Sequence, residues 1–184
     1  RFGIKGIRDL WNIHDRPILC SALKPMGLSA NDLAKLASEF SQGGVDLIKD
    51  DHGLANQSFS TFEQRVLKCQ KAIDQSNPAT VYAPNITAPI NEIYKRAQLA
   101  KEAGCKALLI SPALTGFDAI RMLAEDSTIN LPIVAHPAFI GGFVTSSENG
   151  FSHYALFGQL MRIIGADVSI YPNFGGRFSF SKEE

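Results

Sequence analysis

Short apolar runs alternate with amphipathic stretches along the whole of this 184-residue chain. The alternation is typical of βαβ units, in which a buried strand precedes each helix. The first helical stretch has a Ser29-x-x-Asp32 capping pattern and ends in Gly43 and Gly44, and Pro89 lies at the start of a later one. We predict strands at 17–25, 45–51, 80–87, 105–112, 131–139 and 166–174, and helices at 29–44, 59–76, 89–104, 117–126 and 151–165.

The predicted strands are continuous apolar runs, which indicates a parallel sheet covered on both faces. Two α/β architectures fit: an open doubly wound sheet and a (β/α)₈ TIM barrel. A complete barrel takes about 250 residues. A barrel would therefore be incomplete here, with about six strands in one partial domain over residues 1–184. The chain starts without Met and stops where a helix would begin, so we expect it to be part of a longer protein.

Polar side chains follow nearly every predicted strand at its carboxyl end. A doubly wound sheet gathers its ligand groups at one switch point, whereas a barrel brings all strand ends to one axis. The even spread favours the barrel, and the phosphate fingerprints GxGxxG and GxxxxGK[ST] are absent from the sequence. The residues at these positions are Lys24, Lys49, Asp51, Asn85, Ser111, His136 and Asn173.

The stretch LIKDDHG, residues 47–53, gathers charge at the end of a predicted strand. Side chains alternate along a strand, so Lys49 and Asp51 point to one face and Asp50 to the other. If the first two face the barrel axis, they form a charged pair at its mouth. Buried pairs are costly and tend to mark functional sites. The alternative is an ordinary salt bridge without chemistry.

The composition excludes several classes of function. A formal net charge of +0 and a pI of about 7.1 argue against binding to nucleic acid or to an anionic membrane. No stretch approaches the roughly 20 apolar residues that a membrane span needs. The cysteines, Cys20, Cys69 and Cys105, form no CxxC pair, which favours a reducing cytoplasm and gives no indication of zinc or disulfides.

Three motifs together resemble the barrel domain of the RuBisCO large-chain family: KPMGLS, GGVDLIKDDH and LPIVAHPAF. The likeness is to the non-carboxylating branch, the RuBisCO-like proteins (form IV), and runs through essentially the whole chain. It implies a partial barrel domain that lacks an N-terminal α+β domain and the last two barrel units. It also implies a head-to-tail homodimer whose partner completes the active site.

The resemblance assigns roles to several of the strand-end residues. Lys49 matches the lysine that the family carbamylates with CO₂, and Asp51 matches a carboxylate ligand of Mg²⁺, which prefers hard oxygen ligands. Lys24 matches the lysine that handles protons at the substrate. His136 matches a histidine near the substrate's oxygens or phosphate, and Asn85 matches an asparagine in the site.

The chain also departs from the family pattern. His52 replaces the second carboxylate ligand, and imidazole suits other divalent ions better than Mg²⁺. We expect it to be either a ligand or a hydrogen-bond partner of one. Met26 replaces the second lysine of the carboxylase KPK motif, with a one-residue deletion. The sixth-strand loop reads NFGGRFSF, with Arg177 near the place of the carboxylase lysine.

These losses argue against CO₂ fixation and leave enolisation possible. We expect Asn173 and Arg177 to contact substrate, and the backbone N–H groups of Gly175 and Gly176 to bind its phosphate. His14 and His153 are predicted to be surface or capping residues.

The function implied by the resemblance is a cytoplasmic enolase or isomerase, as in methionine salvage. It would use an enediolate held by Mg²⁺ or another divalent ion on a small phosphorylated ketose or diketone. The alternatives are a decarboxylase of an oxidised sugar phosphate, a genuine carboxylase, and an idle barrel kept for binding or regulation.

Overall fold

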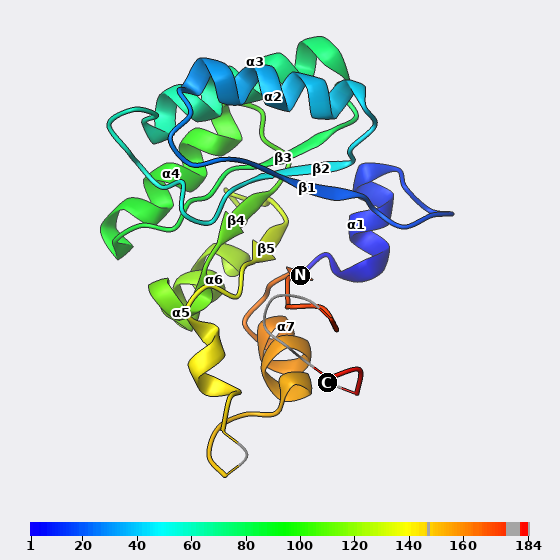
Figure 1. Ribbon diagram of the computed structural model, residues 1–184, viewed down its shortest axis with the longest axis vertical. Helices are drawn as coiled ribbons and strands as arrows, with labels where there is room; N and C mark the ends of the chain where they lie inside the picture. Colours follow the sequence, from blue (N-terminus) through cyan, green and yellow to red (C-terminus); the bar gives the residue numbers. More distant parts are fainter. Residues whose placement is uncertain (147, 176–180, 184) are drawn as a thin grey trace.

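The computed structural model describes residues 1–146, 148–175 and 181–183 (Figure 1). The strands are β1 (Cys20–Leu23), β2 (Leu47–Asp50), β3 (Val81–Ala83), β4 (Leu108–Ile110), β5 (Ile133–Ala135) and β6 (Val168–Ser169). The α-helices are α1 (Gly3–Trp11), α2 (Ala30–Gln42), α3 (Phe62–Ser76), α4 (Ile90–Glu102), α5 (Pro112–Thr115), α6 (Phe117–Glu125) and α7 (Met161–Ile163). A 3₁₀-helix, η1 (Ile140–Phe143), and a π-helix, η2 (Tyr154–Leu160), complete the described elements.

All paired strands are parallel and follow one another in chain order. They form two sheets, β1-β2-β3 and β4-β5-β6. A parallel bridge between Asn85 and Leu109 links the sheets, with hydrogen bonds from Ile86 N to Leu109 O (2.9 Å) and from Leu109 N to Pro84 O (2.9 Å). The α/β prediction with parallel strands is confirmed. Along the described strands the order shows no reversal of the kind that a doubly wound sheet has.

The two faces of the strands bury different partners. Alternate residues such as Ile48, Tyr82 and Ile110 pack with the helices in the larger core. Figure 1 shows α2 and α3 side by side over the β1–β3 sheet. The other face packs against α1 in a smaller core of Ile7, Trp11, Leu47, Val81, Ala83, Ala107, Leu109 and Val134. We call this second surface the inner face.

Helix starts agree with the capping signals in the sequence. The hydroxyl of Ser29 accepts a hydrogen bond from Asp32 N (3.2 Å), and Thr61 accepts one from Gln64 N (3.4 Å). Pro89 is the N-cap of α4. No helix in the described parts of the chain is both long and apolar enough to cross a membrane.

Two differences from the predicted elements have clear origins. The helix α1 was not predicted, because its place depends on burying Ile7 and Trp11 against distant strands. The helix predicted at 151–165 is instead the π-helix η2 followed by the short α7. Periodicity of apolar residues cannot separate these two helical forms, because both bury one side of a helix.

Candidate active site

The site lies where β1, β2 and β5 end. In the sheet register Lys49 lies between Ala22 of β1 and Ala83 of β3. Its neighbour two residues earlier, Leu47, belongs to the inner-face core, so Lys49 points to the same face. Asp50 points the other way, toward Tyr82. The predicted alternation of Lys49 and Asp50 is therefore confirmed.

Asp51 contacts both of the partly exposed basic side chains of the site, Lys24 and His52. Its Oδ2 lies 3.4 Å from Lys24 Nζ, its Oδ1 lies 3.2 Å from His52 Nδ1, and Gly53 N donates to Oδ1 at 3.0 Å. Burial raises the pKa of Asp51, but the Gly53 hydrogen bond and the charges of His52 and Lys24 outweigh it, so the pKa lies below its usual value. Asp51 is therefore a carboxylate that can accept a cation.

Lys49 is buried, with 9% of its surface exposed. Its Nζ donates to the carbonyl of Asp50 at 3.2 Å, and in the described structure no carboxylate oxygen lies within 4.0 Å of it. Burial lowers the pKa of Lys49, and the charge of Lys24 acts in the same direction. The alternative of an ordinary Lys49–Asp51 salt bridge is wrong. Lys24 is the lysine that pairs with Asp51, because Leu23 pairs with Asp50 in the sheet register and the residues that follow therefore lie side by side. A lowered pKa raises the fraction of the neutral amine, which is the form that reacts with CO₂.

His136 follows β5 and meets the residues from β2. Its ring stacks on His52, with centroids 4.4 Å apart and planes inclined by 16°. Burial, followed by the charge of Lys49, lowers the pKa of His136 to about 3. Its Nδ1 accepts a hydrogen bond from Ala138 N (3.1 Å), so the proton of the neutral ring is on Nε2. His136 can therefore donate one hydrogen bond from Nε2.

Asn85 lies beneath the loop that follows β2. It is fully buried, and its Nδ2 donates to the carbonyls of His52 (2.9 Å) and Leu54 (3.0 Å). Its Oδ1 accepts from Thr87 N at 3.2 Å. The amide is thus engaged with the backbone, and contact between Asn85 and substrate stays a prediction.

Among the described residues predicted after β6, Asn173 and Gly175 have no hydrogen bond or ion pair with Lys24, Lys49, Asp51 or His136. Asn173 and Gly175 are exposed, and Asn173 Nδ2 donates to the carbonyl of Phe174 at 3.1 Å. Gly176 and Arg177 lie outside the described residues. The phosphate and substrate roles of these four positions stay predictions.

Asp50 and Arg65 form a buried ion pair that sequence reasoning missed. Both side chains have 0% exposure, and Arg65 Nε lies 3.0 Å from Asp50 Oδ2. Tyr82 donates its hydroxyl hydrogen to Asp50 Oδ1 (2.7 Å), and Asn85 N donates to Oδ2 (2.9 Å). The alternation of side chains already predicts that Asp50 faces the helices. An arginine in the first turn of the next helix could therefore have been recognised from the sequence as its partner.

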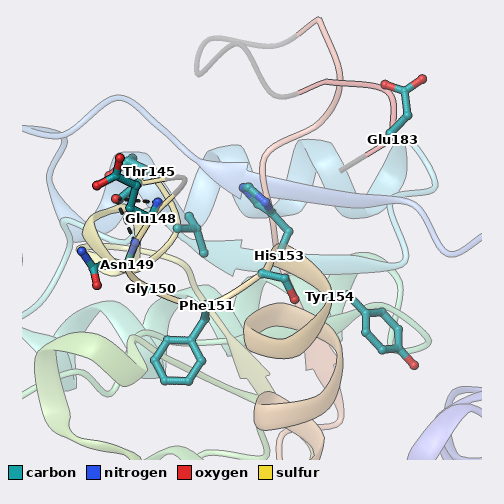
Figure 2. Close-up of a pocket in the computed structure, with 11 residues that line it drawn as sticks. Thr145, Glu148, Asn149, Gly150, Phe151, His153, Tyr154 and Glu183 are labelled. Carbon is teal, nitrogen blue, oxygen red and sulfur yellow. Dashed lines mark hydrogen bonds between the residues drawn. The ribbon is translucent and has the colours of Figure 1, made fainter.

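A separate pocket of about 590 Å³ lies between the loop after β5 and the start of η2. In Figure 2 the loop with Thr145 and Asn149 lies on one side, Glu183 on the other, and His153 between them. The lining includes none of the clustered residues Lys24, Lys49, Asp51 and His136. His153, predicted to be a surface or capping residue, lines this pocket and a second one beside Phe157.

The donor set fits a divalent ion only if Lys49 is carbamylated. The described residues contain no group of three His, Cys, Asp or Glu side chains that could hold a metal. Asp51 supplies a carboxylate and His52 an imidazole, so a third ligand is missing. A carbamate on Lys49 would add two hard oxygens beside Asp51, which suits Mg²⁺. The buried amine with its lowered pKa is consistent with that modification.

Comparisons with known proteins show the family of this chain. Residues 3–173 match the family described as "Ribulose bisphosphate carboxylase large chain, catalytic domain". A ribulose bisphosphate carboxylase-like protein of Archaeoglobus fulgidus is 41% identical over 100% of this chain and 43% of its own length. A 2,3-diketo-5-methylthiopentyl-1-phosphate enolase of Geobacillus thermodenitrificans is 38% identical over 100% of this chain and 46% of its own length. The chain thus spans slightly less than half of these relatives.

A solved structure supports the same relationship. The RuBisCO-like protein of Rhodopseudomonas palustris superimposes with a TM-score of 0.90 and 39% identity, over 98% of this chain and 51% of that one. The family match covers every described strand, and the structural match covers 98% of the chain. The chain therefore belongs to the RuBisCO large-chain family, and within it to the RuBisCO-like proteins.

Proposed function

We propose that the protein is an enolase-type enzyme that acts on a small phosphorylated diketone or ketose. The carrying observation is the meeting of Lys24, Asp51 and His136 from three strand ends above the buried amine of Lys49. Relatives named 2,3-diketo-5-methylthiopentyl-1-phosphate enolase support this class of reaction.

We also propose that the complete protein closes a (β/α)₈ barrel. The support is the consecutive order of six parallel strands with helices on one face and α1 on the other. A homodimer and a cytoplasmic location belong to the same proposal. The first is implied by the family resemblance, and the second by cysteines that include the buried free thiols Cys69 and Cys105.

Each clustered residue has a distinct part in the proposed reaction. The Lys49 amine takes up CO₂ to form a carbamate and releases a proton. With Asp51 and His52 it would hold the divalent ion, which supplies Lewis-acid stabilisation of the developing enolate oxygen. Lys24, which reaches solvent above Asp51, relays the proton from the substrate's α-carbon. His136 donates its Nε2 hydrogen to a substrate oxygen.

A second candidate is a barrel that binds ligand without catalysis. It is favoured by His52, which leaves Asp51 as the single carboxylate beside Lys49 in the described cluster. Such a protein would neither bind a divalent ion tightly nor exchange a substrate's α-proton. A genuine carboxylase is disfavoured, because Met26 replaces the second lysine of the carboxylase KPK motif.

The test is α-proton exchange of 2,3-diketo-5-methylthiopentyl-1-phosphate in D₂O, followed by NMR with Mg²⁺ and bicarbonate. The full-length protein should catalyse exchange. Lys49→Arg keeps a positive charge but cannot form the carbamate, so exchange should fall by at least about 100-fold, the upper range for loss of groups that support a metal. Lys35→Arg, on the exposed surface of α2, is the matched control. Equal exchange by the wild type and Lys49→Arg would disprove the role of Lys49.

A further inference from the structure

Arg65 is a fully buried arginine of α3 that lies beneath the loop joining β2 to α3. This loop, residues 51–61, carries Asp51 and His52, and we call it the ligand loop. The guanidinium uses all three nitrogens. Nε binds Asp50 Oδ2 (3.0 Å), Nη1 donates to Ser60 O (3.1 Å), and Nη2 donates to Ala55 O (2.9 Å) and Leu54 O (3.5 Å).

The ligand loop has little secondary structure, so side chains replace the missing backbone partners. Asn85 binds the carbonyls of His52 and Leu54, and Gln57 Nε2 donates to Gly53 O at 2.8 Å. Arg65 binds the carbonyls that follow. Consecutive carbonyls of the loop are therefore fixed from below by donors on three different segments.

The same hydrogen-bond network also includes Asp50, the last residue of β2. Asp50, between Lys49 and Asp51, accepts from Arg65, Tyr82 and Asn85 N. Because adjacent residues of a strand share one backbone, holding the Asp50 side chain fixes the direction of both neighbours. Arg65 thus holds the strand end and the ligand loop together from the helix side.

We infer that Arg65 is a positioning residue: its forked bonds to Asp50 and to the ligand-loop carbonyls set Asp51 and His52 relative to Lys49. The inference rests on the proposed divalent-metal site. Arginine is required because its planar fork reaches an anion and several carbonyls at once, whereas lysine is a single point charge. Arg65 touches neither substrate nor metal ligand directly.

The test compares Arg65→Lys with the wild-type full-length protein. Lysine keeps the charge partner of Asp50 but cannot bind the three carbonyls. Mn²⁺ affinity in bicarbonate buffer, measured by electron paramagnetic resonance, should weaken by about 10- to 100-fold, as is typical for partners that orient metal ligands. The spectrum of bound Mn²⁺ should also change. Asn85→Ser, which loses the bonds to His52 O and Leu54 O, should act in the same direction.

Ser41→Ala is the matched control. Ser41 is a buried polar residue whose hydroxyl donates to Thr80 Oγ1 (3.2 Å), just before β3, at the opposite ends of the strands. It should lower stability without changing Mn²⁺ affinity. Unchanged affinity in Arg65→Lys, or an equal loss in Ser41→Ala, would overturn the positioning role.

Amide hydrogen exchange in the metal-free protein separates this inference from the proposed function. Arg65→Lys should speed exchange at the bonded amides of Leu54, Ala55 and Ser60, while Ser41→Ala should not. If the wild type binds no Mn²⁺, the proposed metal site is wrong. Faster exchange at these amides then still supports Arg65 as the residue that holds the ligand loop, and unchanged exchange refutes it.

Discussion

Two adjacent aspartates, the last residue of β2 (Asp50) and the residue that follows it (Asp51), point to opposite sides and have opposite environments. The Asp50 side chain has 0% exposure and accepts from an arginine, a tyrosine and a backbone amide. The Asp51 side chain is 13% exposed and is accompanied by the more exposed side chains of Lys24 and His52. Asp50 has its hydrogen-bonding capacity filled by the protein, whereas Asp51 is left able to take a cation.

The comparison shows how one strand separates stability from chemistry. A buried charge is tolerated on the helix side because Arg65 and Tyr82 compensate for its lost hydration. On the inner face, the partners of Asp51 are the partly exposed side chains of Lys24 and His52, so its carboxylate is still able to bind a cation. We expect the loss of Asp50 to lower mainly stability and the loss of Asp51 to lower mainly cation binding, while Arg65, which also binds the ligand loop, affects both.

The largest effect should come from Asp50→Ala. The substitution leaves Arg65 as a buried, unpaired cation, so the free energy of unfolding should fall by about 3–5 kcal/mol. Asp51→Ala removes only partly exposed contacts and should cost at most about 1 kcal/mol. Urea unfolding of the two variants measures both values. Similar losses for the two aspartates would break the distinction between the faces.

A smaller effect should appear as a dependence of stability on pH. The pKa of His136 is about 3 in the folded protein, against an ordinary value of 6.5. Between these values the unfolded chain binds a proton that the folded protein does not, so stability falls as the pH falls below 6.5. At pH 5 the loss amounts to at most about 2 kcal/mol, at roughly 1.4 kcal/mol for each pH unit, and solvent screening of this partly exposed ring reduces it.

Urea unfolding of the metal-free protein at pH 7.5 and pH 5 checks this expectation. His136→Gln should remove most of the difference between the two pH values. His14→Gln, at an exposed position before β1, should leave it in place. A His136→Gln variant with the wild-type pH dependence would show that His136 is accessible to protons in the fold.

The smallest effect should come from Tyr82→Phe. It removes the hydroxyl that donates to Asp50 but keeps the ring in the helix-side core. A hydrogen bond to a charged group contributes about 1.5–3 kcal/mol, and the lower end applies because Arg65 and Asn85 N remain. Thermal unfolding measures the loss, and Mn²⁺ affinity should stay within about twofold. A large loss of affinity with little loss of stability would show that the Tyr82 hydroxyl, and not only Arg65, positions the metal ligands through Asp50.

The sequence was sufficient for the repeated strand–helix order and for the face of Lys49, because both depend on local periodicity. It was not sufficient for the partner of Asp51, since the position of Lys24 beside Asp51 on the neighbouring strand depends on sheet register. The carbonyl-binding roles of Arg65 and Asn85 were also missed. They depend on the path of an irregular loop, which leaves no periodic signal.

The position of α1 gives the protein an internal reporter. Trp11 is the sole tryptophan of the sequence and is 6% exposed, packed with Leu47 and Val81 at the first residues of their strands. Its fluorescence therefore reports on the amino ends of the strands, which lie opposite the carboxyl ends that carry Asp51. A variant that alters ligand binding but leaves the tryptophan emission unchanged has been perturbed only at the carboxyl ends of the strands. This optical check needs no added label.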